Sequence, residues 1–170
     1  MQNTRLRQKI IGELKSDDVC RRIDAITSLP SLGREMGISI AEEIMKLGDN
    51  MGMKLEALRV LPALTDDTLL TPLSRILDLA ITDADSEVVR NAMITVQNLP
   101  QRYISRSVIE TIFGKLSDVD TDIVFHAINC LVYLREVIDT AEARVRIQPF
   151  SQHSNKTLRE LAKKALTLID

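Results

Sequence analysis

The chain has 170 residues with 22 basic and 24 acidic side chains, which gives a formal charge of −2 at neutral pH. Apolar residues make up 45% of it, but aromatic residues make up only 3% and tryptophan is absent. This length and composition predict a single domain, residues 1–170, with a continuous aliphatic core. The balanced charge disfavours a nucleic-acid-binding protein, which normally carries a basic stripe.

Helical patterns occur in pairs along the chain, and a short polar turn separates the two helices of each pair. The expected pairs are Thr4–Lys15 with Val19–Leu29, Ile38–Leu47 with Met53–Leu64, Leu70–Ile81 with Glu87–Leu99, Ser107–Leu116 with Ile123–Leu134, and Thr140–Ile147 with Thr157–Ile169. The turns inside the pairs are rich in Asp, Asn and Ser, whose short side chains favour capping of the second helix. Pro30 and Pro100 are expected to end their helices.

A repeat of 35 residues connects the second helices of all five pairs. Its three columns are Ile26, Leu61, Val96, Leu131 and Leu166, then Leu29, Leu64, Leu99, Leu134 and Ile169, then Arg22, Ala57, Ala92, Ala127 and Ala162. Within a helix these positions return to the same face. We therefore expect every column residue in the core except Arg22, whose long side chain can lie along the surface.

A period of this size indicates stacked supersecondary units that bury their apolar faces against their neighbours. Helix pairs with an Asp-rich turn, a following Val88-Val89-Arg90-Asn91-Ala92 pattern and a later aliphatic pair resemble HEAT repeats over essentially the whole chain. Residues 53–55 and 123–125 depart from the family pattern. The resemblance implies an all-α fold, a right-handed α-solenoid of about five antiparallel helix pairs. An up-down helical bundle is the alternative.

Polar outer faces on the first and last helices predict capping units at both ends of the array. No segment has the run of apolar residues needed for a membrane span or a signal peptide, so we expect a cytoplasmic protein. Cys20 and Cys130 lie three repeats apart, which is too distant for a disulfide, and both are expected to be reduced thiols.

No arrangement of residues demands catalysis, a metal or a cofactor. The run Asp118–Asp122 begins like a calcium-binding loop, but its sixth position is Ile123 and its twelfth is Asn129, where that loop needs Gly and Glu. His126 and His153 do not have the spacing of metal ligands. We therefore expect no enzymatic activity, no cofactor and no metal site.

One surface stands out on the second helices of the third and fourth units. Its members lie off the core columns and combine a cation, aliphatic and aromatic side chains and an amide: Arg90, Ile94, Phe125, Asn129 and Tyr133. In HEAT arrays the second helices line the concave surface. Aromatic and Arg side chains are favoured as anchors of protein interfaces, so we expect these residues to bind a partner.

The favoured function is a noncatalytic protein–protein interaction module, adaptor or chaperone-like, that binds a protein or peptide on its concave face. The alternative is an accessory protein resembling the phycobilisome lyase HEAT proteins. A nucleic-acid-associated protein is a weaker alternative because residues 36–134 carry a net charge of −6 and the basic cluster is terminal, at Lys156, Arg159, Lys163 and Lys164.

Overall fold

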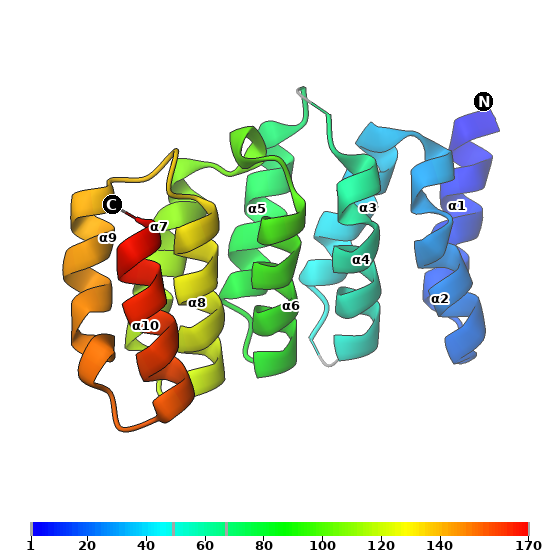
Figure 1. Ribbon diagram of the computed structural model, residues 1–170. Helices are drawn as coiled ribbons and strands as arrows, with labels where there is room; N and C mark the ends of the chain where they lie inside the picture. Colours follow the sequence, from blue (N-terminus) through cyan, green and yellow to red (C-terminus); the bar gives the residue numbers. More distant parts are fainter. Residues whose placement is uncertain (1, 49, 67, 170) are drawn as a thin grey trace.

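Helix pairs stack in a single row in the computed structural model, which describes residues 2–48, 50–66 and 68–169 (Figure 1). The α-helices are α1 (Gln2–Leu14), α2 (Val19–Thr27), α3 (Arg34–Met45), α4 (Met51–Leu64), α5 (Leu70–Ile81), α6 (Ser86–Asn98), α7 (Arg106–Gly114), α8 (Thr121–Tyr133), α9 (Thr140–Ile147) and α10 (Lys156–Leu168). Short 3-10 turns are η1 (Leu29–Leu32), η2 (Gln101–Tyr103), η3 (Lys115–Ser117) and η4 (Gln148–Gln152). The described ranges contain no strand.

The helices form two layers. The second helices of the pairs, α2, α4, α6, α8 and α10, pack each against the next, and α3, α5 and α7 do the same in the other layer. Within each pair the first helix packs antiparallel on the second, and α1 and α10 lie at opposite ends of the row (Figure 1). The predicted fold class is therefore confirmed: the chain is an all-α solenoid of stacked helix pairs.

The repeat columns form the centre of the core, as predicted. The Ile26, Leu29 and Ala57 columns are buried throughout the first four units apart from Arg22, and Ala162 and Ile169 are buried in the fifth. Leu166 is an exception, because it is only partly buried where no described helix follows α10. The Arg22 guanidinium donates a hydrogen bond to the Ser16 carbonyl, which satisfies the charge at the edge of the first unit.

Several helices end earlier than the sequence predicts. The predicted second helices reach the second column, but α2 ends at Thr27 and α6 at Asn98, and Leu29 and Leu99 are buried just beyond them. Leu99 has an extended backbone with ψ of 143° because the following Pro100 disfavours helical geometry before it. In the other direction, α3 begins at Arg34, earlier than the predicted Ile38.

Capping side chains confirm the predicted role of the acidic turns. Asp18, Asp85 and Asp120 each accept a hydrogen bond from a backbone N–H in the first turn of the following second helix. In the fifth unit Asn155 performs this role. Asn50, before α4, forms no such side-chain bond.

Two further expectations concern the whole chain. None of the helices in the described ranges is long and apolar enough to cross a bilayer. Both cysteines are free thiols, as predicted: Cys20 is exposed on α2 and Cys130 is buried in α8.

Candidate functional site

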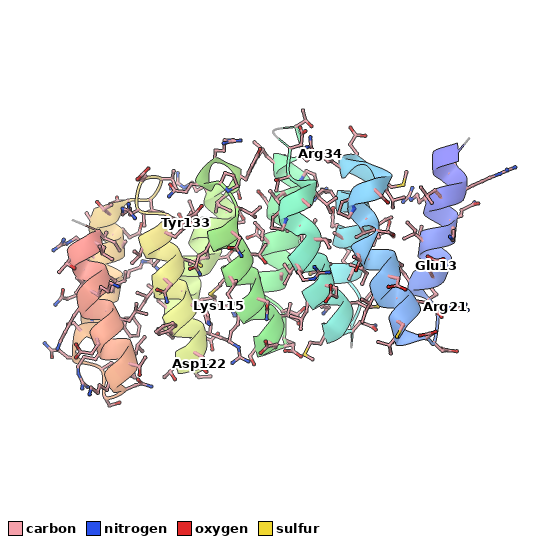
Figure 2. The ribbon with its side chains drawn as sticks, turned by 45° about the vertical axis from the view of Figure 1, so that its right-hand side comes forward. Glu13, Arg21, Arg34, Lys115, Asp122 and Tyr133 are labelled. Carbon is pink, nitrogen blue, oxygen red and sulfur yellow. The ribbon has the colours of Figure 1, made fainter. Side chains whose placement is uncertain are left out.

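The sides of α4, α6 and α8 that point away from the core columns form a continuous surface, which we call the second-helix face. Its residues are Leu55, Arg59 and Pro62 of α4, Arg90, Asn91, Ile94 and Asn98 of α6, and Phe125, His126, Asn129 and Tyr133 of α8. In Figure 2 this row of helices faces the viewer, with Asp122 and Tyr133 marking the two ends of α8. All of these side chains are exposed or partly buried.

The five residues that the sequence singles out lie together on two neighbouring helices. Arg90 and Ile94 are one turn apart on α6, and Phe125, Asn129 and Tyr133 occupy successive turns of α8, which packs against α6. Ile94 is 41% exposed, so it presents apolar area to solvent. The other four are partly buried.

Tyr133 has a structural role in addition to its place on this face. Its hydroxyl donates a hydrogen bond of 2.5 Å to the Leu99 carbonyl, and the Gln101 side chain donates one of 2.5 Å to the Tyr133 carbonyl. Both bonds tie the end of α8 to the segment after α6. Removal of the whole side chain therefore affects folding as well as the surface.

Phe125 and Asn129 are also partly held by their own helix. The Phe125 ring packs against the core, and its edge meets the His126 imidazole with 5.7 Å between ring centroids. The Asn129 amide donates a bond of 3.0 Å to the Phe125 carbonyl. The Phe125 ring is thus partly buried, with neighbours both in the core and on its own helix.

A charge network surrounds Arg90. The Arg90 guanidinium pairs with Glu87 on its own helix and with Asp122 on α8, at 3.7 Å. The hydrogen bond from Arg90 holds the pKa of Glu87 below its usual range. Burial of His126, together with the nearby Arg90 cation, lowers the pKa of the imidazole. Arg90 is therefore fixed in an ion-paired position at the edge of the face.

The structure also shows a groove that the sequence analysis does not predict. It has a volume of about 300 Å³ between α4 and α6 and is lined mainly by Leu55, Arg59, Pro62, Ile94 and Asn98. The repeat itself contained the signal, because stepping back 35 residues from Arg90 and Ile94 leads to Leu55 and Arg59. The candidate surface thus extends over three helices.

The acidic turns at one end of the helices serve the fold. Hydrogen bonding by the Asp120 backbone N–H lowers the pKa of the Asp118 carboxyl, which also pairs with Lys115 at 3.3 Å. These carboxylates accept bonds from their own turn, as the capping interpretation predicts. Across the described ranges, no group of three or more His, Cys, Asp or Glu side chains is placed to hold a metal ion.

Neither a protein-family model nor a curated protein sequence matches the chain. Solved structures match it along nearly its whole length. An engineered protein has a TM-score of 0.63 and 17% identity, with 96% of this chain and 78% of the other covered. The complex of CpcE and CpcF of phycocyanin lyase from Nostoc sp. PCC7120 has a TM-score of 0.63 and 20% identity, with 95% and 98% covered. The chain therefore shares with these proteins the fold of an α-solenoid of stacked helix pairs.

Proposed function

We propose that this protein is a noncatalytic interaction module that holds a protein or peptide partner on its second-helix face. The observation that carries the proposal is the groove between α4 and α6, where the exposed Ile94 lies among apolar and amide side chains and the ion-paired Arg59 and Glu56. Exposed apolar area rimmed by polar groups is characteristic of protein-binding surfaces.

The charges of this face favour a protein partner over a nucleic acid. Arg59 pairs with Glu56 at 2.7 Å, and Arg90 pairs with Glu87 and Asp122, so the cations on α4 and α6 are balanced by neighbouring carboxylates. Nucleic-acid binding depends on cations that neutralise phosphates. A partner with apolar anchors and neutral polar groups is the better complement.

Phycobilisome lyase-like handling of a pigment and its acceptor protein is the second candidate. Its support is the similarity of fold to the CpcE and CpcF complex over 95% of this chain, at 20% identity. The two candidates share a protein-binding surface and differ in whether a pigment is also present.

Purification from the native host, with identification of the material that copurifies, separates these candidates. A bound protein without pigment supports the interaction module, a bound tetrapyrrole supports the lyase-like function, and bound nucleic acid contradicts both.

The captured partner then allows a test of the aromatic anchor. Phe125→Ala should weaken its binding by roughly tenfold or more, because truncation of a hot-spot aromatic residue costs about 2 kcal/mol or more. Phe150→Ala is the matched control, since it removes a partly buried ring that packs on the core at η4, outside the second-helix face. It should lower the melting temperature with little change in affinity. Unchanged affinity of a folded Phe125→Ala protein removes Phe125 from the site.

A further inference from the structure

One ion pair joins the second and third units inside the protein. Lys54, on α4, donates a hydrogen bond of 2.6 Å to Asp83, in the turn before α6. Their side chains are only 8% and 10% exposed. The bond therefore crosses the boundary between two repeats where little water screens it.

The repeat shows that a charge is not needed at this position for packing. The residues 35 and 70 positions after Lys54 are Val89 and Val124, both buried. Replacing a buried ion pair by apolar residues of similar volume is often neutral or stabilising, so such a pair is weak evidence for stability. Its better-attested role is to specify one arrangement of the elements that it joins.

Hollows flank the boundary that the pair crosses. One is the groove between α4 and α6, and the other is a hollow of about 510 Å³. The second hollow is lined by Met45, Leu47 and Met51 from one unit and by Asp83 and Val88 from the next, with Lys54 also in its wall.

The next boundary is tied differently. Between the third and fourth units, Tyr133 bonds to the Leu99 carbonyl, Cys130 bonds to the Met93 carbonyl and Thr111 bonds to Asp78. These ties are spread over both layers. The boundary between the second and third units has the exposed Arg75–Glu42 pair, at 3.1 Å, in the layer of first helices. It also has the buried Lys54–Asp83 pair, at the turn before α6.

We propose that the Lys54–Asp83 pair is a latch that fixes the angle between the second and third units and thereby holds the α4–α6 groove in one shape. A hinge or shear between packed elements needs a bistable contact that can release. Here release of the pair lets α4, with Leu55 and Arg59, move relative to Ile94 on α6. The latch belongs to the scaffold and does not rest on the proposed partner.

Distances between pairs of spin labels test the latch directly. The first pair, Ser39→Cys with Lys164→Cys, spans the boundary between the second and third units, and the second, Thr71→Cys with Lys164→Cys, does not. The labelled positions Ser39, Thr71 and Lys164 are exposed. Cys20, which is also exposed, is changed to Ser in every labelled protein so that it takes no label. Cys130 stays in place, because burial raises the pKa of its thiol to about 12 and keeps it from reacting with the label.

The test variant is Lys54→Val with Asp83→Asn, which installs the residue of the neighbouring repeats and leaves no unpaired buried charge. We expect the distance distribution of the first label pair to broaden while that of the second keeps its width, in a protein whose circular dichroism spectrum is unchanged. Lys115→Met, which breaks the pair with Asp118 inside one unit, is the control and should broaden neither. An unchanged first distribution, or equal broadening of both, overturns the proposal. If the double variant does not fold, Asp83→Asn alone is measured by the same criteria.

Discussion

Gly37 is the position where the smallest added side chain should have a clear effect on folding. It lies in α3, where a Cβ atom would be 2.6 Å from the Leu64 Cδ2 atom and 3.0 Å from the Leu29 carbonyl oxygen. Leu29 and Leu64 are both fully buried members of the second repeat column. The methyl group of Leu64 has little room to move away, and the carbonyl oxygen of Leu29 belongs to the backbone.

Two opposing effects decide the outcome of Gly37→Ala. Alanine favours a helix over glycine by about 1 kcal/mol in the helix interior. Overpacking of a close-packed core typically costs about 1–3 kcal/mol. Because one of the two contacts is with backbone, we expect the steric effect to win, with a net loss of up to about 2 kcal/mol in the free energy of unfolding.

Urea unfolding monitored by far-ultraviolet circular dichroism measures this loss, and Gly12→Ala is the matched control. Gly12 lies in α1, and a Cβ there would meet no atom within 4 Å. It should therefore gain about 0.5–1 kcal/mol from helix propensity alone. If Gly37→Ala is stabilised as much as Gly12→Ala, the close packing of α3 against the two column leucines is wrong.

Three further predictions follow from the core, the latch and the thiols. Leu131→Ala should lower the free energy of unfolding by about 2–5 kcal/mol in the same assay, because it opens a cavity at a fully buried column position. Burial by itself would raise the pKa of Asp83, but the hydrogen bond from Lys54 and other bonds outweigh it and hold the pKa below its usual range. The stabilisation that ionised Asp83 contributes is therefore complete above its unfolded pKa of about 3.9, and it is lost as the pH falls through the lower pKa of the folded protein. The urea midpoints of the native protein and of Asp83→Asn should therefore converge in acid. A thiol reagent at neutral pH should modify Cys20 quickly and Cys130 only after unfolding, and rapid modification of both in the native protein contradicts the burial of Cys130.

The sequence predicts most of the fold because its repeat encodes the packing. Each second helix places a small residue and two aliphatic residues on one face, so Ala92, Val96 and Leu99 already define the core of their unit. Turn residues such as Asp85 indicate where a helix starts, because their side chains accept a hydrogen bond from a backbone N–H of its first turn. Helix ends were less predictable, because Leu99 is in the core whether or not it is helical.

The repeat pattern does not predict the individual contacts between neighbouring repeats. The pattern places Tyr133 off the buried column but does not reveal the hydrogen bond of its hydroxyl to Leu99. Lys54 in a sequence suggests an exposed position, and only the structure shows that Asp83 of the next unit allows its burial. The repeat does indicate that α4 contributes to the candidate surface, since Leu55 and Arg59 precede Arg90 and Ile94 by 35 residues. The groove between α4 and α6 depends on how the two helices pack, which the repeat does not give.

The affinity of the captured partner for two single variants tests the central claim that binding occurs on the second-helix face. Ile94→Asp puts a charge into the α4–α6 groove, and Val145→Asp puts one on α9, in the other layer, where the native side chain is 74% exposed. Titration calorimetry should show at least about tenfold weaker binding for Ile94→Asp, since the variant removes exposed apolar area and the new carboxylate must lose its water when the partner covers the groove. Val145→Asp should bind like the native protein. Equal affinities for the two variants, or selective weakening by Val145→Asp, would place the partner elsewhere on the solenoid.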